Sequence, residues 1–173
     1  PMIRVSRGSV LSPLRPLLDA GIRSHSSKNV RIESFVGRCA PAAQRCPFGC
    51  FVFTSNVDGQ FQKAGFPEDS ILECHGSVHV LQCTRCAHEI WSADGTFVEV
   101  NEETIRAAAP LPTCPGCGAI ARPNVLMFND GDWDSSRTDG QQQRYHDWLR
   151  RSKGRRIVAI ELGAGLAIPT VRV

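Results

Sequence analysis

Residues 71–86 read ILECHGSVHVLQCTRC, an apolar run that leads into His75 and then into a Cys-x-x-Cys pair. A second pair follows after 27 intervening residues, so the chain carries four candidate metal ligands: Cys83, Cys86, Cys114 and Cys117. Two turn-prone knuckles of this kind aim four thiolates at one point and complete a closed tetrahedral shell. The spacing therefore predicts one structural zinc ion. Two disulfides or inert buried thiols are the alternative interpretation.

The composition is that of an ordinary soluble protein. The chain has 173 residues, 42% hydrophobic and 21% charged, with a formal net charge of +3, and can bury a real core. Met2 is followed by polar and basic residues, and no apolar run approaches the roughly 20 residues that span a bilayer. We expect a cytoplasmic location. One basic cluster is either a solvated helix face or a nucleic-acid patch: Arg144, Arg150, Arg151, Lys153, Arg155 and Arg156.

From residue 51 onward the pattern predicts an open α/β sheet. Residues 51–54 and 156–162 are short apolar runs, typical of buried parallel strands. The polar loop 55–59 and the glycine-containing loop 163–165 follow these strands. Ligands bind beyond the carboxyl ends of the strands in such sheets. Another strand is expected at 124–128.

Three helices are expected in the same part of the chain. Residues 60–64 form a short helix, and residues 102–109 form a second one between the two cysteine pairs. Residues 139–153 form an amphipathic helix with Asp139 as N-cap and one apolar face, made by Tyr145, Trp148 and Leu149. Residues 1–50 are rich in Pro, Arg, Ser and Cys and show poor helical periodicity.

A few polar residues could carry chemistry. Imidazole suits general-base work because its unperturbed pKa is about 6.5, so His75 is a candidate base. It is otherwise a structural histidine or a spare ligand. Asn56 and Asp58 could bind ribose hydroxyls or an amide ligand, although both residue types are also common in turns. Gly163-Ala164-Gly165 lets a ligand approach the backbone closely, or forms a simple turn.

Taken together, these motifs resemble the sirtuins, the NAD-dependent protein deacylases. The resemblance covers residues 51–173 and rests on Thr54–Gly59, His75–Ser77, the four cysteines and Arg122–Phe128. It implies a partial Rossmann-like parallel sheet at residues 51–78 and 124–173, which would bind NAD. A small zinc-binding module would be inserted at residues 79–123. Residues 1–50 would be an atypical segment, poorly ordered or non-homologous.

The resemblance also implies a role for each matching residue. His75 would deprotonate a ribose hydroxyl of NAD, and Asn56 would hold the ribose and a water. The acyl group of an acylated lysine would pass to ADP-ribose, with release of nicotinamide. The cofactor-binding residues would be Ser55, Asn56, Val57, Asp58, Gly163, Ala164 and Gly165, with Asp58 on the nicotinamide carboxamide. The substrate strand would be formed by Val125, Met127 and Phe128.

Some family features do not occur in this sequence. Residues 1–50 contain neither the Gly-Ala-Gly-x-Ser phosphate loop nor the Gly-x-x-Asp-Phe-Arg loop, and we expect a truncated member of the family. Three functions compete. The first is deacylation of a lysine in a protein or peptide, without a nucleic-acid or membrane partner. The second is a non-catalytic, zinc-stabilised binding module or gene relic, and the third is a nucleic-acid-binding zinc ribbon.

Overall fold

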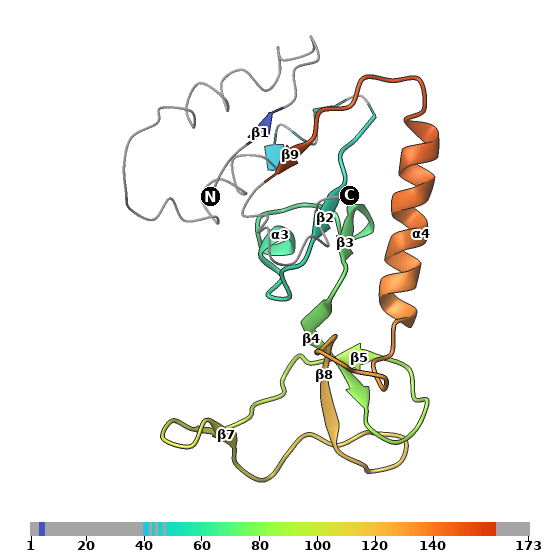
Figure 1. The fold of residues 1–173 in the computed structure, drawn as a ribbon. Coiled ribbons are helices and arrows are strands. Elements are labelled where there is room, and N and C mark those ends of the chain that lie inside the picture. Colours follow the sequence, from blue (N-terminus) through green and yellow to red (C-terminus); the bar gives the residue numbers. More distant parts are fainter. Residues whose placement is uncertain (1–3, 6–39, 42, 44, 47, 162–173) are drawn as a thin grey trace. The chain divides into compact units, whose positions relative to one another are not determined.

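The structure, a computed structural model, describes residues 4–5, 40–41, 43, 45–46 and 48–161 (Figure 1). The chain divides into two compact units. Unit 1 comprises Pro1–Ser55, Gln60–Leu72 and Gln141–Val173, and unit 2 comprises Asn56–Gly59 and Glu73–Gly140. The described residues form both helices and strands, as the predicted α/β class requires. None of the helices in the described part of the chain is long and apolar enough to cross a membrane.

Unit 1 contains a strand–helix–strand segment. Strand β2 (Val52–Thr54) is followed by α3 (Gln60–Lys63), the 3-10 turn η1 (Glu68–Ser70) and β3 (Ile71–Glu73), and β3 pairs with β2. This order of elements is typical of parallel strands, which need a crossover connection. The predicted strand, polar loop and short helix over residues 51–64 are confirmed. A buried cluster lies under this segment and consists of Ala40, Ala43, Val52, Phe66 and Ile71.

Helix α4 (Ser136–Arg151) provides aromatic contacts within unit 1. Its Tyr145 and Trp148 rings lie 5.2 Å and 5.9 Å from the ring of Phe51. The indole Nε1 of Trp148 donates to the Phe48 carbonyl at 3.2 Å. These contacts confirm the predicted aromatic face, whereas Leu149 stays 37% exposed. The six basic side chains of the predicted cluster are all exposed.

Unit 2 is organised by a three-stranded antiparallel sheet of order β5-β4-β8 (Figure 1). The central strand β4 (Gly76–Cys83) pairs with β5 (Trp91–Ser92) and with β8 (Ala121–Val125). The β4–β8 pairing has an irregularity between Ser77 and Leu81. One end of this pairing places Cys83 opposite Ala121, and the other places Gly76 opposite Val125.

The helix predicted at residues 102–109 is wrong. The chain there forms a hairpin of β6 (Val100–Asn101) and β7 (Arg106–Ala107). The Asn101 side chain caps one turn, because its Oδ1 accepts hydrogen bonds from the backbone of Glu103 (3.1 Å) and Thr104 (2.8 Å). The turn does not continue as a helix, because Ile105 adopts a left-handed conformation (φ 53°).

Helix α4 begins earlier than predicted, so Asp139 is not its N-cap. The Ser135 carbonyl accepts the Asp139 amide at 2.8 Å, which makes Ser135 the capping residue. Asp134 Oδ1 accepts the Ser136 amide at 3.0 Å, and Ser135 Oγ donates to the Asp139 carboxylate at 2.8 Å. Asp139 therefore lies in the first turn, where a negative charge favours the helix N-terminus.

The strand predicted at residues 156–162 is also wrong, both in its length and in its predicted parallel pairing. Only β9 (Ile160–Glu161) forms in the described part of this segment, and it pairs antiparallel with β1 (Arg4–Val5). Ile157 is 49% exposed, so the apolar run is not buried along its length. Leu162 and the predicted loop Gly163-Ala164-Gly165 lie outside the described residues.

Candidate functional site

Four cysteine thiols converge in unit 2 and form a candidate metal centre. Their Sγ atoms all lie within 4.8 Å of one another, and they belong to Cys83, Cys86, Cys114 and Cys117. The shortest sulfur–sulfur separations are 3.5–3.7 Å. A tetrahedral zinc site with Zn–S bonds of about 2.3 Å requires sulfur–sulfur edges of about 3.8 Å. The cluster therefore fits one zinc ion with four thiolate ligands, as the spacing predicts.

The knuckle backbone stabilises negative charge on this cluster. The amides of Arg85 and Cys86 each donate to Cys83 Sγ at 3.3 Å. Hydrogen bonding from the Cys86 amide, with smaller contributions from Arg85 and neighbouring thiols, lowers the pKa of Cys83 to about 6. Contacts with the other sulfurs, first Cys117 and then Cys83, raise the pKa of Cys86. A cation bound by all four sulfurs would relieve this crowding of negative charge.

His75 lies between β3 and β4, beside the end of β8. Its carbonyl accepts the Leu126 amide at 3.0 Å, which continues the pairing of Gly76 with Val125. Gly76 has φ +78°, and a Cβ there would lie 2.0 Å from the Asn124 carbonyl oxygen. The His-Gly sequence therefore allows the chain to turn tightly against β8, and His75 itself remains partly exposed.

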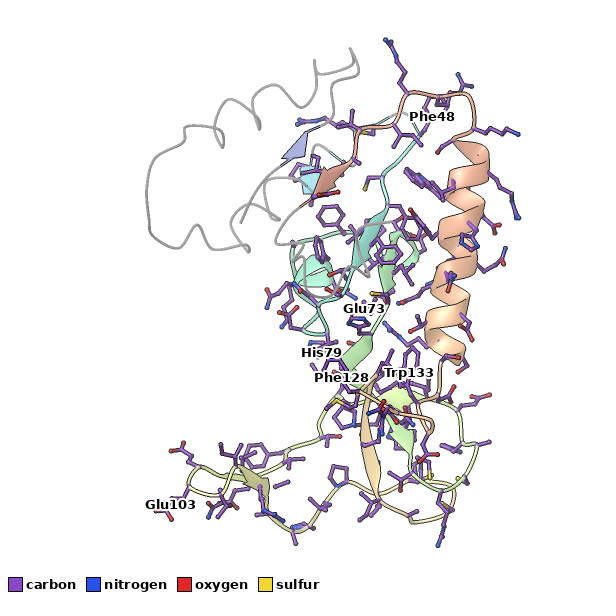
Figure 2. All side chains as sticks on the ribbon, in the orientation of Figure 1. Phe48, Glu73, His79, Glu103, Phe128 and Trp133 are labelled. Atoms are coloured by element: carbon purple, nitrogen blue, oxygen red, sulfur yellow. The ribbon has the colours of Figure 1, made fainter. Side chains whose placement is uncertain are left out.

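The loop 56–59 lies against the first residues of β4. The Val57 carbonyl accepts the Val78 amide at 2.9 Å, and Ser77 Oγ lies 3.5 Å from the same oxygen. His79 Nε2 lies 3.0 Å from the Asp58 carbonyl oxygen (Figure 2 labels His79). The side chains of Asn56 and Asp58 are exposed. The structure thus brings the predicted NAD-binding loop and the segment that follows His75 into direct contact.

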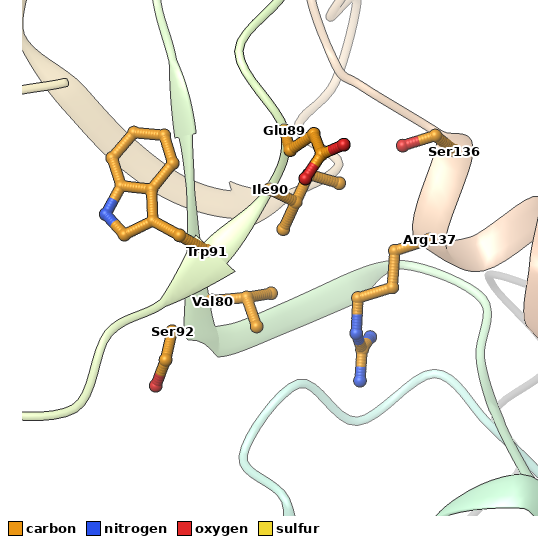
Figure 3. A pocket seen from close by; sticks show the side chains of 7 residues that line it. All are labelled: Val80, Glu89, Ile90, Trp91, Ser92, Ser136 and Arg137. Atoms are coloured by element: carbon orange, nitrogen blue, oxygen red, sulfur yellow. The ribbon is translucent and has the colours of Figure 1, made fainter. Parts of the chain in front are cut away.

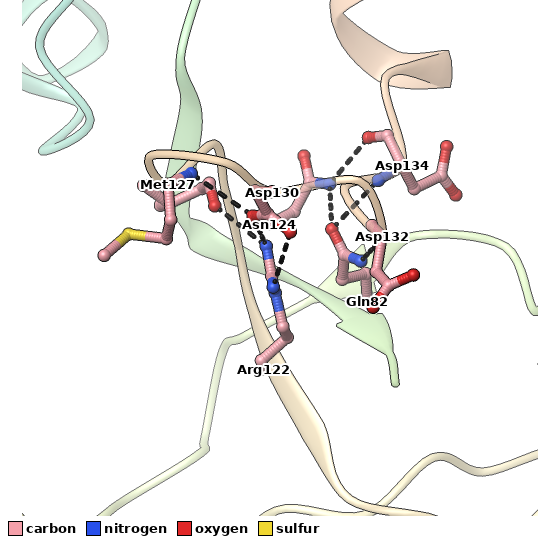
Figure 4. Close-up of polar contacts among 8 residues, drawn as sticks. Gln82, Arg122, Asn124, Met127, Asp130, Asp132 and Asp134 are labelled. Carbon is pink, nitrogen blue, oxygen red and sulfur yellow. Dashed lines mark hydrogen bonds and ion pairs between the residues drawn. The ribbon is translucent and has the colours of Figure 1, made fainter. Parts of the chain in front are cut away.

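The end of β8 differs from the predicted strand at 124–128. The strand stops at Val125, because the Arg122 guanidinium donates to the Val125 carbonyl at 3.1 Å and forms an ion pair with Asp130 (Figure 4). The Asp130 carboxylate in turn accepts the Met127 amide at 3.2 Å. The arginine also lowers the pKa of Asp130 below its usual range, chiefly by hydrogen bonding. Met127 and Phe128 are left 61% and 88% exposed on the loop.

A second set of polar contacts holds the far end of this loop. Asn124 is fully buried, and its Nδ2 donates to Gln82 Oε1 at 2.9 Å and to the Asp134 carbonyl at 2.8 Å (Figure 4). Gln82 Nε2 donates to the Asp132 carbonyl at 2.8 Å. Sequence reasoning missed this network. The residue types are ordinary, and only the register of β4 against β8 brings them together.

Comparison with known proteins assigns the family. Residues 44–147 match the model of the Sir2 family, which is more than half of the chain. The chain belongs to the Sir2 family. Its sequence is 33% identical over 81 residues to the NAD-dependent protein deacylase 2 of Pseudomonas aeruginosa, covering 47% of this chain and 28% of that protein. It is 37% identical over 79 residues to the NAD-dependent protein deacylase of Aeropyrum pernix, covering 46% and 27%.

The match to these relatives is partial. This Sir2 chain spans less than a third of the length of the curated relatives it matches. Among solved structures, a Sir2 homologue in complex with NAD aligns with a TM-score of 0.43 at 22% identity, covering 69% of this chain and 38% of that one.

The predicted site residues of this Sir2 protein fall into four groups. Asn56, Val57, Asp58, His75 and the substrate-strand residues all belong to unit 2. Ser55 is exposed and belongs to unit 1. The glycines at 163 and 165 lie outside the described residues. The metal ligands form their own cluster at the opposite end of the β4–β8 pairing from Gly76.

A shallow pocket of about 490 Å³ lies elsewhere in unit 2 (Figure 3). It is lined by Val80, Glu89, Ile90, Trp91, Ser92, Ser136 and Arg137, and includes none of the predicted site residues. Its floor is the β4–β5 pair, where Val80 lies opposite Ser92. The pocket does not correspond to the predicted cofactor or substrate site.

Proposed function

We propose that this chain acts in NAD-dependent deacylation of lysine residues in proteins, with transfer of the acyl group to ADP-ribose. Membership of the Sir2 family supports the proposal, as do relatives named NAD-dependent protein deacylases. The observation that carries it is the set of backbone hydrogen bonds around His75. The Leu126 amide bonds the His75 carbonyl, and the Val78 amide bonds the Val57 carbonyl. The segment 75–78, which carries the candidate base, is thus hydrogen-bonded both to a candidate cofactor loop and to a candidate substrate segment.

Each residue has a distinct task in this proposal. NAD, when bound, would supply an electrophilic ribose carbon as nicotinamide leaves. The His75 imidazole would accept a proton from a ribose hydroxyl, which suits a partly exposed histidine. The Asn56 amide would hold the ribose and an ordered water. The Asp58 carboxylate would accept the carboxamide N–H of the nicotinamide group.

The substrate would bind as an extended segment beside β8. Val125 ends the strand, and the exposed Met127 and Phe128 side chains follow it. An acyl-lysine peptide could add its backbone next to this segment, with these side chains providing apolar contacts. The metal centre would have a purely structural role, because four thiolates leave no open coordination position for a substrate.

Calorimetric titration of NAD into the zinc-loaded chain, followed by a deacylation assay on an acetyl-lysine peptide, tests the proposal. We expect sub-millimolar NAD binding, and turnover that His75→Ala abolishes while NAD binding persists. His146→Ala, at an exposed histidine on α4, is the matched control and should keep both properties. A folded, zinc-containing chain that does not bind NAD would contradict the proposal. Binding without turnover would reject deacylation and leave an NAD-binding protein.

A further inference from the structure

Two carbonyl groups of the loop 56–59 are held by hydrogen bonds from β4. Val57 and Asp58 are consecutive residues, and both carbonyls accept hydrogen bonds from the 77–79 segment of β4. The Asp58 contact comes from a side chain, the His79 imidazole, at 3.0 Å. A carbonyl held in this way restricts rotation of the peptide and therefore the direction in which the Asp58 side chain leaves the backbone.

The irregularity in β4 explains how His79 reaches this carbonyl. Pairing with β8 shifts register between Ser77 and Leu81, so Val78 and His79 are released from the β8 ladder. The Val78 amide turns to Val57 instead. The His79 backbone is fixed on both sides, because its amide donates to Ser77 Oγ at 3.3 Å and its carbonyl accepts the Ala93 amide at 2.9 Å. Bulges of this kind often re-aim a side chain next to a functional site.

We propose that His79 is a positioning residue that sets the specificity of the loop for the nicotinamide end of NAD. The inference rests on the proposed function, in which Asp58 binds the carboxamide. His79 does not touch the cofactor in this proposal. Its Nε2–H donates to the Asp58 carbonyl, and the aligned loop then presents the Asp58 carboxylate to the carboxamide. The contact is exposed to solvent, so its contribution is modest.

Three variants of the full chain test this role. His79→Phe keeps a ring of similar size and removes the donor, whereas His79→Gln keeps an N–H at similar reach. His146→Phe controls for an added exposed phenylalanine. Affinities for NAD and for ADP-ribose, which lacks nicotinamide, are measured by calorimetry. We expect His79→Phe to weaken the affinity for NAD about threefold to tenfold, which corresponds to roughly 0.7–1.4 kcal/mol. The affinity for ADP-ribose should be nearly unchanged. His79→Gln should restore much of the preference for NAD over ADP-ribose.

Hydrogen exchange of the Val78 backbone amide gives a measurement that needs no cofactor. This amide bonds the Val57 carbonyl, so loosening of the loop should speed its hydrogen exchange in His79→Phe but not in His146→Phe. If the unaltered chain does not bind NAD, faster Val78 exchange would support the contact while the proposed function fails. Unchanged exchange, or equal losses of NAD and ADP-ribose affinity, would overturn the inference.

Discussion

The ion pair between Arg137 and Glu73 should be a major determinant of the stability of unit 2. Arg137 Nη2 lies 2.6 Å from Glu73 Oε2, and the two side chains are 20% and 1% exposed. Thr138 Oγ also donates to the Glu73 carbonyl, at 3.3 Å. The first turn of α4 is thereby bonded to the last residue of β3, two positions before His75.

We expect Arg137→Met to lower the free energy of unfolding by about 3 kcal/mol. Removing one partner of a buried pair typically costs 3–5 kcal/mol, because the other charge is left without compensation. We take the lower end because one fifth of the Arg137 side chain is exposed to water. For a chain of this length, that loss corresponds to a decrease in Tm of about 6–12 °C. Glu73→Gln should cost less, since a neutral amide can still accept a hydrogen bond.

Urea denaturation of the zinc-loaded protein, followed by tryptophan fluorescence, measures the effect. The matched control is Arg150→Met, because Arg150 pairs with Asp147 on the surface, where the side chains are 72% and 36% exposed. A surface pair contributes about 0–1 kcal/mol. The double variant Glu73→Gln/Arg137→Met then isolates the coupling of the two charges. A loss for Arg137→Met no larger than the loss for Arg150→Met would refute the reasoning.

Three further predictions concern the metal centre, a glycine and a carboxylate. Zinc analysis should find about one ion per chain, and chelation or Cys114→Ser should unfold unit 2 cooperatively, whereas a metal-free, folded chain would contradict the site. Gly76→Ala should cost more than about 3 kcal/mol, because its Cβ would lie 2.0 Å from the Asn124 carbonyl. The control is Gly95→Ala, at φ +74° with no atom near the added Cβ, which should cost only about 1 kcal/mol. Equal losses of unfolding free energy for the two variants in chemical denaturation would contradict the clash at Gly76. The lowered pKa of Asp130 should stabilise the fold above pH about 4, with this contribution lost as the pH falls through the folded-state pKa. Acid titration of Asp130→Asn should therefore show a weaker loss of stability than the unaltered chain, and identical profiles would exclude this carboxylate as a cause.

Local features of the sequence predicted the parts of the fold that depend on near neighbours. The two cysteine pairs converge because each knuckle is a short turn, and the β4–β8 pairing brings the knuckles together. The short strand at residues 52–54 and the helix that follows are likewise local. The hairpin at residues 100–107 was mispredicted because the turn that Asn101 caps ends at Ile105, whose left-handed conformation (φ 53°) no residue pattern indicates.

Features that depend on particular side-chain contacts outside the recognised motifs could not be predicted. The extent of β8 is set by the Arg122–Asp130 pair, which turns the chain away after Val125. The start of α4 was placed too late because Asp139 is a favourable N-cap residue, whereas its carboxylate accepts a hydrogen bond from Ser135 Oγ inside the first turn. The contact between His79 and the Asp58 carbonyl depends on a register shift in β4. No local pattern encodes such a shift.

The positions of the candidate residues bear on whether NAD binding depends on the metal centre. The proposed contacts of the nicotinamide and of the reacting ribose all lie in unit 2, within residues 56–59 and 73–140. These contacts share backbone hydrogen bonds, so they should form or be lost together when unit 2 folds around its metal. Nicotinamide-end contacts should therefore depend on zinc even though no thiolate touches the cofactor in the proposed function. A zinc-depleted chain that retained the NAD-over-ADP-ribose preference would show that the loop and the metal centre are independent.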